Sequence, residues 1–571
     1  MADDILEAND LPLDSNFVEQ AEYIDEEAFL TLNATHPEEE SIIRRLGAGG
    51  AKLLVGPRGC GKTTLMLKAY YHLLRTERVN TLPIYVNFKL SLKLEPLYQN
   101  TPNASFWFRL WLNLKIYEGL HAAIETSKRY LIPSGTPTKA EVTSMITAIE
   151  SGHVDVASQN EKININSLAD HIGYVLEANG LTRCVLLLDD AAHAFSPRQQ
   201  EDFFEFFRQI KSRAISPKAA IYPGITTHSP SFHVGHDAEQ IDVWVRPDTA
   251  EYVDFMRSLA LKRFGGELPQ TIGSTDNVME LLAFSSFGIP RSFLNMLRTI
   301  YHEEDKSKKK SPLSRRKILD IAKQGRDLSH NVYDSLEFKL PAFKEFVHTG
   351  SDVYKSLIST LKELNKKRDE DKQALEVGIK KPVPQELDKV FSFLQYAGLL
   401  MPIGTNSRGV KGVFDLYMVH FGDLVVENAV VGRRTKTISS FVSALTSQTH
   451  QAWPRVSPET LINEAERPNI FRLSLPNCQN CGAERSNEHA KFCQNCGAQL
   501  KNASLYDQLT KQDISVLPIS ETMVKRIKEN SRIKTIKDIL IDTDRKSLRS
   551  VPFIGPVRAA RIAGYAEEHV A

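Results

Sequence analysis

The stretch Gly56-Pro57-Arg58-Gly59-Cys60-Gly61-Lys62-Thr63 decides how the N-terminal half of this chain folds. Its spacing is G-x-x-x-x-G-K-[ST]. The apolar run from Ala51 to Val55 before it predicts a strand, and the apolar spacing from Thr64 to Tyr70 after it predicts a helix. A strand, a glycine-rich loop and a helix, in this order, are the context that the motif requires.

This loop predicts a phosphate-binding site. Its glycines let backbone N–H groups turn inward without a Cβ clash, and the positive end of the following helix favours an anion. The Lys62 ammonium would neutralise the β- and γ-phosphates, and the Thr63 hydroxyl would ligate Mg²⁺. The residues predicted to bind a nucleoside triphosphate are Gly56, Pro57, Arg58, Gly59, Cys60, Gly61, Lys62, Thr63 and Thr64. The alternative is a glycine-rich turn that matches by chance.

Composition indicates a multidomain protein. A chain of 571 residues is too long for one core, and 42% hydrophobic with 25% charged residues is ordinary for a globular protein. No apolar run is long enough to cross a bilayer, and the acidic N-terminus lacks a signal pattern, so we expect a cytoplasmic location and no membrane contact. Residues 1–40 contain no Lys or Arg, whereas 306–317 are strongly basic. This asymmetry predicts nucleic-acid contact in the second half; solvated loops are the alternative.

Strands and helices alternate after the loop. The predicted strands are 82–88, 184–188, 219–225 and 241–245, and the predicted helices are 104–130, 168–176 and 199–211. Residues 131–165 read as a polar insertion. This alternation predicts a three-layer α/β domain around a parallel sheet.

Two acids end the apolar run Cys184 to Leu188, which is typical of a buried central strand. They would lie at the carboxyl end of the sheet, where such folds bind ligands. We expect Asp189 to associate with Mg²⁺ and Asp190 to activate water, a solvated strand end being the alternative. Thr226 or Thr227 would place a hydroxyl near the γ-phosphate, and Arg291 would reach back to the phosphates from a helical lid.

In this order the pieces resemble the AAA+ superfamily, and more closely its origin-recognition-complex-like branch. The resemblance covers residues 40–300, and reaches 432 if a winged helix follows. GPRGCGKT at 56–63, VLLLDD at 185–190, the polar end of the 219–227 strand and GIPR at 288–291 match its Walker A, Walker B, sensor 1 and sensor 2 elements. The resemblance implies ATP, Mg²⁺, a helical lid and a DNA-binding winged helix.

Two departures from that family resemble the signal-transduction ATPases with numerous domains, in which ATP is a switch. Asp190 stands where a Glu is usual, and residues 227–240 contain no Arg to serve a neighbouring subunit. Hydrolysis is therefore expected to be slow, and the oligomeric state is left open. His228, His233 and His236 in this stretch lack regular ligand spacing and are interpreted as polar loop residues rather than a metal set.

The second half contains a candidate winged helix. Residues 251–264 and 276–284 have helical spacing and would form the lid. A helix over 385–396, a strand over 398–403, a glycine-rich loop and a strand over 413–419 follow the winged-helix order. An ordinary α+β unit has the same order, so both interpretations stay open.

Two identical CQNCGA stretches place Cys478, Cys481, Cys493 and Cys496 in the spacing C-x₂-C-x₁₁-C-x₂-C. Four thiolates satisfy tetrahedral Zn²⁺ and leave no open position, so the predicted site is structural. A redox dithiol pair is the alternative. The pattern resembles a short zinc ribbon, which binds either nucleic acid or protein.

Residues 551–562 resemble a helix-hairpin-helix motif, with companion helices near 514–518 and 536–540. That family holds a DNA phosphate with backbone amides of the hairpin. Phe553 replaces the first hairpin glycine, and Arg558 and Arg561 share a helical face that would compensate. A helical protein-docking domain is the alternative.

These patterns divide the chain into predicted segments. They are an acidic segment (1–40), a P-loop ATPase core (41–247), a helical lid (248–304), a basic linker (305–329), a winged-helix-like domain (330–432), a linker (433–475), a zinc ribbon (476–500) and a helix-hairpin-helix-like domain (501–571). We predict an ATPase, slowly releasing ADP and phosphate, that couples nucleotide state to DNA binding mostly through phosphate contacts. The alternative is a signalling scaffold that docks a protein effector. Family analogy points to microbial defence or mobile-element biology.

Overall fold

The structure is a computed structural model, and it describes most of the chain. The described residues are 14–17, 20–24, 26–76, 80–100, 103–127, 130–152, 163–190, 196–273, 277–306, 312–431, 437–446, 453–463, 465, 467–485, 490, 492–500 and 504–570. In these ranges no helix is both long and apolar enough to cross a membrane.

A parallel five-stranded sheet forms the centre of the N-terminal half, in the order β2-β3-β4-β1-β5. Its strands are β1 (Lys52–Val55), β2 (Thr81–Asn87), β3 (Arg183–Asp189), β4 (Ile215–Ile221) and β5 (Glu239–Asp242). The predicted α/β class with a parallel sheet is confirmed. The largest differences from the predicted bounds are in β4, which spans Ile215–Ile221 rather than 219–225, and in β5, which spans Glu239–Asp242 rather than 241–245.

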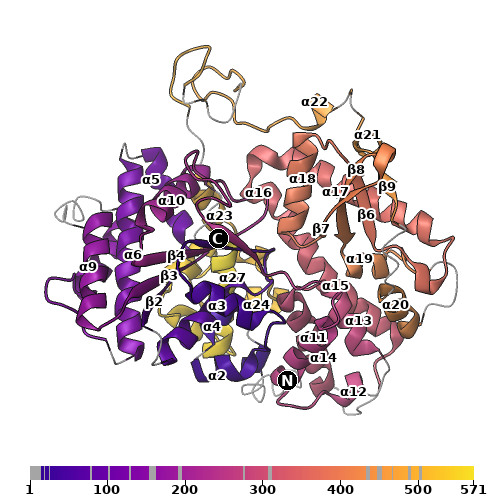
Figure 1. Ribbon diagram of the computed structural model, residues 1–571, viewed down its shortest axis with the longest axis horizontal. Coiled ribbons are helices and arrows are strands. Elements are labelled where there is room, and N and C mark those ends of the chain that lie inside the picture. The colour runs from indigo at the N-terminus through magenta and orange to yellow at the C-terminus, as the bar shows by residue number, and fades with distance from the viewer. Residues whose placement is uncertain are drawn as a thin grey trace.

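The sheet is covered on both faces because successive strand residues point to opposite sides. Leu54 packs with α3 (Glu39–Gly47) and α4 (Lys62–Arg75) in one core, and Leu53 belongs to a second core on the other face. The helices of the second core are α6 (Ala104–Ser127), α7 (Lys139–Glu150), α9 (Ile165–Ala178) and α10 (Pro197–Ile210) (Figure 1). Two helical layers therefore enclose the strands.

Two stretches have more structure than their polar sequence predicted. Helix α7 lies in the predicted insertion 131–165, where Thr138 and Glu141 form a capping box that starts it. In the acidic segment, helix α2 (Glu26–Leu32) buries Phe29, and Phe17 packs against lid residues. Apolar residues spaced among the acids therefore join the core.

The lid is a helical layer next to the core. It contains α11 (Tyr252–Arg263), α12 (Gln270–Gly273), α13 (Val278–Ser285) and α14 (Pro290–Lys306). Helix α15 (Arg315–Asp334) occupies most of the predicted basic linker and buries Ile318 and Ile321 in the same core as α14. Its basic residues begin a helix because Ser314 caps it through the Lys317 amide.

A second sheet, in the order β7-β8-β6-β9, forms the next domain. Its strands are β6 (Glu376–Lys380), β7 (Leu400–Ser407), β8 (Val413–Val419) and β9 (Arg455–Val456), and its helices are α16 (Leu336–Lys339), α17 (Lys344–Asn365), α18 (Gln385–Tyr396), α19 (Phe421–Val426) and α20 (Ile438–Leu445). Helix α18 and strand β8 have the predicted bounds. Strand β9 pairs in parallel with β6, so residues within the predicted linker 433–475 belong to this sheet. Two short helices follow, α21 (Pro458–Leu461) and α22 (Arg467–Ile470).

The C-terminal helices return to the nucleotide-fold half. They are α23 (Leu505–Thr510), α24 (Glu521–Asn530), α25 (Ile536–Ile541), α26 (Lys546–Arg549) and α27 (Pro556–Val570), drawn in yellow on the same side of the view as the five-stranded sheet in Figure 1. The Ser504 hydroxyl donates a hydrogen bond to the carboxylate of Glu95, the first residue of helix α5 (Glu95–Asn100), and this bond holds the start of the C-terminal group. The C-terminal helices thus contact the N-terminal half of the chain.

Candidate functional site

The glycine-rich loop connects β1 to α4, as predicted. Gly59 and Gly61 have φ angles of 83° and 101°, a region that L side chains rarely adopt. A Cβ at Gly56 would lie 2.6 Å from the Cys60 sulfur. Glycine is therefore required at the turns that aim the backbone amides inward.

Lys62 lies inside this loop. Its ammonium donates hydrogen bonds to the carbonyls of Gly56 at 2.8 Å and Pro57 at 2.9 Å, and it lies 3.6 Å from the centre of the Tyr222 ring. Only 5% of the residue is exposed, and burial lowers its pKa below the ordinary lysine value. A buried cation with carbonyl partners is positioned for an anion that enters the loop.

Asp189 ends β3 and is fully buried. It accepts hydrogen bonds from the Tyr85 hydroxyl at 2.9 Å and from the Asp190 amide at 3.0 Å, and the Thr63 hydroxyl is a further partner. Burial, followed by the charge of Asp190, raises the pKa of its carboxyl to about 7. Thr63 and Asp189, the two predicted Mg²⁺ ligands, are therefore neighbours with oxygen donors of the type that Mg²⁺ prefers.

Asp190 has a φ angle of 53°, which turns its carboxylate away from the strand direction. The Tyr222 hydroxyl donates to it at 2.7 Å. Tyr222 directly follows β4 and touches both Asp190 and Lys62, although sequence reasoning did not single it out. Tyr222 could have been identified as the residue that follows an apolar strand. The strand was predicted to continue to residue 225, so Tyr222 was counted as part of it.

The two predicted threonines point elsewhere. The Thr226 hydroxyl donates to the Tyr222 carbonyl and accepts from its amide, which closes a turn. The Thr227 amide donates to Gln200 of α10 at 2.6 Å. A cavity opens at the glycine-rich loop, lined by residues 58–64, Asp190 and Tyr222 together with residues of the N-terminal segment, the lid and α27. Thr227 is not part of this lining. The catalytic role of Thr227 stays a prediction.

Arg291 enters the cavity from the start of α14. Gly288 makes this approach possible, because its φ is 74° and a Cβ there would lie 2.0 Å from the Val245 carbonyl. The Arg291 amide faces the Gly59 carbonyl at 3.4 Å, and its guanidinium pairs with the Glu568 carboxylate at 2.9 Å. The lid therefore contacts the glycine-rich loop directly.

The N-terminal segment and the lid add apolar and aromatic residues to the lining of the cavity, namely Ala34, His36, Phe255, Leu259 and Leu294. Lys68, which donates to the Ala34 carbonyl, lies among them. Burial lowers the pKa of His36 below its usual value, so its ring is neutral at pH 7. Lys62 and Arg291 line the same cavity. The sequence did not identify Ala34 and His36, because 33–36 follow no periodic pattern.

The four cysteines meet at one point. Their sulfur atoms all lie within 4.8 Å of one another, and the Cys478–Cys496 and Cys481–Cys493 pairs are each 3.6 Å apart. Tetrahedral Zn–S bonds of about 2.3 Å place sulfurs about 3.8 Å apart, so the set fits one zinc ion. Within the described ranges no group of three or more ligands forms around His228, His233 or His236.

The two cysteine knuckles repeat each other. The amides of Cys478 and Cys493 donate to the carbonyls of Ala483 and Ala498, each at 2.8 Å. Gly482 and Gly497 have φ angles of 74° and 69°, which the identical turns require. The identical sequence stretches therefore fold into identical turns.

The predicted hairpin at 551–562 comprises the turn after α26 and the first residues of α27. Phe553, at the position of the family's first glycine, has a φ of 67°, as a glycine there would. The Arg526 guanidinium lies 4.7 Å from the Phe553 ring centre, and Arg558 donates to the Phe553 carbonyl at 3.0 Å. Phe553 therefore has the backbone conformation of the glycine that it replaces, and Arg526 and Arg558 both contact it.

No protein-family model matches the chain, and no curated protein matches it. Solved structures similar to it include a Walker-type ATPase of Pyrococcus abyssi, with 14% identity and a TM-score of 0.38, over 70% of this chain and 97% of that one. Cdc6p from Pyrobaculum aerophilum has 14% identity and a TM-score of 0.25, over 76% and 97%. Drosophila ORC bound to DNA has 13% identity and a TM-score of 0.29, over 70% and 90%. At these TM-scores the likenesses establish neither function nor partners for this chain.

Proposed function

We propose that the chain is an ATP-binding switch ATPase that couples its nucleotide state to DNA binding. The observation that carries this proposal is the convergence of Lys62, Thr63, Asp189, Asp190 and Arg291 on one loop and cavity. Cations, oxygen ligands and a carboxylate for water then lie where phosphoryl transfer requires them.

Each residue has a distinct task in this proposal. Lys62 and Arg291 neutralise the β- and γ-phosphates, and Thr63 and Asp189 would hold Mg²⁺, which supplies charge neutralisation when bound. Asp190 orients the attacking water and accepts its proton. Because the Tyr222 hydroxyl holds Asp190 and an Asp is one methylene shorter than a Glu, we infer slow turnover.

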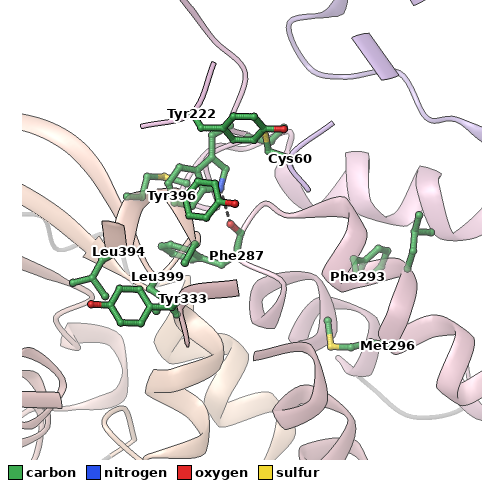
Figure 2. Close-up of a cluster of buried hydrophobic side chains, with 14 of the residues drawn as sticks. Cys60, Tyr222, Phe287, Phe293, Met296, Tyr333, Leu394, Tyr396 and Leu399 are labelled. Carbon is green, nitrogen blue, oxygen red and sulfur yellow. Dashed lines mark hydrogen bonds between the residues drawn. The ribbon is translucent and has the colours of Figure 1, made fainter. Parts of the chain in front are cut away.

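The same loop contacts the second domain, which supports coupling. The Arg58 amide donates to the Tyr396 carbonyl at 3.1 Å, at the end of α18. Tyr396 lies 5.7 Å from Tyr222, ring centre to ring centre, and the two appear together with Cys60 in Figure 2. Lys389 of α18 donates to the Gly224 carbonyl at 2.7 Å, in the turn after β4. A shift of the loop around phosphate would therefore reach α18.

Two surfaces support DNA as the partner. Helix α18 and the β7–β8 hairpin fit the winged-helix interpretation, and the hairpin tip exposes Val410 between Arg408 and Lys411. Residues 521–561 contain eleven Lys or Arg against five Asp or Glu. Basic groups spread over two modules favour contacts to phosphate rather than to bases.

Duplex binding by the full-length protein tests this function. We expect ATP to change duplex affinity at least tenfold relative to ADP. If the modules contact about four phosphates, the plot of log affinity against log salt has a slope of about −4. Filter binding with ATP, with ADP and without nucleotide measures both quantities. The salt series runs from about 50 to about 300 mM, where affinity for DNA falls steeply. Equal affinity in all three states would contradict the proposal.

One observation favours a protein effector as the second candidate. Helix α18 exposes Asp388, and Glu386 is half-buried opposite Arg467. The helix lies against the turn at Gly224, where a Cβ would be 2.5 Å from Ser392. Acids on the exposed face oppose a DNA groove and suit a basic protein surface. No duplex binding at low salt, combined with intact ATP binding, would favour this scaffold function.

We further propose that the cysteine cluster is a structural zinc ribbon. We expect one zinc per chain, because four thiolates complete the tetrahedron. Elemental analysis of purified protein measures the ratio, and Cys478→Ser is expected to lower it severalfold. Cys184→Ala is the control, since Cys184 is buried in β3 away from the cluster. A ratio near zero in the unaltered protein would exclude the ribbon.

A further inference from the structure

A carboxylate from the far end of the chain lies in the nucleotide cavity. Glu568, in the last turn of α27, lines it together with the glycine-rich loop and Arg291. Its Oε1 atom pairs with the Arg291 guanidinium at 2.9 Å, and its side chain is 20% exposed. An anion therefore already neutralises the arginine assigned to the γ-phosphate.

The backbone of Glu568 is bound as well. Its carbonyl accepts hydrogen bonds from Arg58 at 2.9 Å and from Lys339 at 3.1 Å. Arg58 belongs to the glycine-rich loop and Lys339 to α16, so one residue joins three parts of the fold. The helix end carries partial negative charge, which these cations complement.

Neighbouring contacts hold α27 in this position. Glu567 pairs with Lys89, another residue of the cavity, at 3.3 Å. Gly564 lies so close to Gln20 that a Cβ would be 2.1 Å from its side-chain oxygen. His569 contacts Gln512 at 2.8 Å, within the C-terminal group. The helix is docked along its length rather than touching the cavity by one side chain.

The cations around Glu568 keep it ionised. Burial alone would raise the pKa of its carboxyl, but Arg291, Arg58 and Lys89 together lower it to about 2. At neutral pH the group is an anion with paired cations, as a phosphate oxygen would be.

We propose that Glu568 is an internal competitor of the triphosphate, so that ATP binding releases α27 from the cavity. This inference rests on the proposed function, because it takes the cavity to be the ATP site. A triphosphate offers Arg291 and Arg58 more charge than one carboxylate does, so it can displace the helix.

Removal of the carboxylate tests the competition. If the helix closes the cavity in about nine molecules of ten, Glu568→Gln raises ATP affinity about tenfold. The control is Glu529→Gln, which removes the same charge from an exposed site on α24. Titration of the full-length protein with a fluorescent ATP analogue measures the affinities.

Hydrogen exchange gives a second readout that does not depend on the affinity change. The amides of α27 are expected to exchange faster when ATP is added, and faster in Glu568→Gln without nucleotide. Equal ATP affinity of the unaltered protein and Glu568→Gln, with unchanged exchange in α27, overturns the inference and leaves the ATP site standing. Loss of ATP binding in every form, including the unaltered protein, overturns the proposed function and the inference with it.

Discussion

Lys62→Ala is expected to abolish ATP binding, weakening affinity at least about 100-fold. Two hydrogen bonds from a buried ammonium to phosphate oxygens contribute roughly 3 kcal/mol, which corresponds to that factor. The ammonium also binds the carbonyls of Gly56 and Pro57, so the substitution removes the group that orders the loop. Isothermal titration with ATP and Mg²⁺ measures the loss.

The control for this experiment is Lys52→Ala. Lys52 begins β1, at the end opposite the loop, and pairs with Glu239. The substitution removes the same charge from β1, the strand that leads into the loop. It is expected to leave ATP affinity unchanged within about twofold, because Lys52 does not line the cavity. Near-normal ATP affinity in Lys62→Ala would show that the loop assignment is wrong.

Asp190→Asn is expected to separate binding from hydrolysis. The amide keeps the size of the side chain and accepts the hydrogen bond from Tyr222, but it cannot take a proton from water. Loss of a general base typically lowers kcat by about 100- to 10,000-fold, so bound ATP should persist. Single-turnover release of phosphate and equilibrium ATP binding, measured on the same preparation, give the two quantities.

The matched control is Asp170→Asn on α9, which is exposed and distant in sequence from the loop. Its turnover should equal that of the unaltered protein. If Asp190→Asn also turns over normally, another group activates the water, and Asp190 has only the structural contact with Tyr222.

Local patterns predicted the part of the site that local geometry builds. A strand, glycines and a helix within 20 residues fix Lys62 and Thr63, because positive φ angles and the helix start depend on neighbours in the sequence. The apolar run of β3 likewise identified Asp189 and Asp190, since parallel strands end at one edge. The Cys478 to Cys496 knuckles were predicted for the same reason.

Groups that reach the cavity over long sequence separations could not be predicted. Glu568 follows the glycine-rich loop by about 500 residues, and no spacing rule connects them. Tyr222 was missed because the apolar stretch continues past the last strand residue, and Thr226 folds back on it. Helix α15 and strand β9 were hidden in stretches whose charge and polarity suggested linkers. Tertiary packing determines where these residues lie, and the periodicity of the sequence carries no information about it.

The four cysteines lie on a tether between two fixed points. The Ser474 amide is bonded to the Ala342 carbonyl, and Ser504 to Glu95, while the knuckles project from the body of the molecule (Figure 1). An ion that cross-links the knuckles would shorten the reach of this tether. The effective concentration of a tethered group depends on the length of its linker. Metal content would therefore change how often a released α27 binds to the cavity again. The knuckles would then govern the resetting of the switch without touching nucleotide.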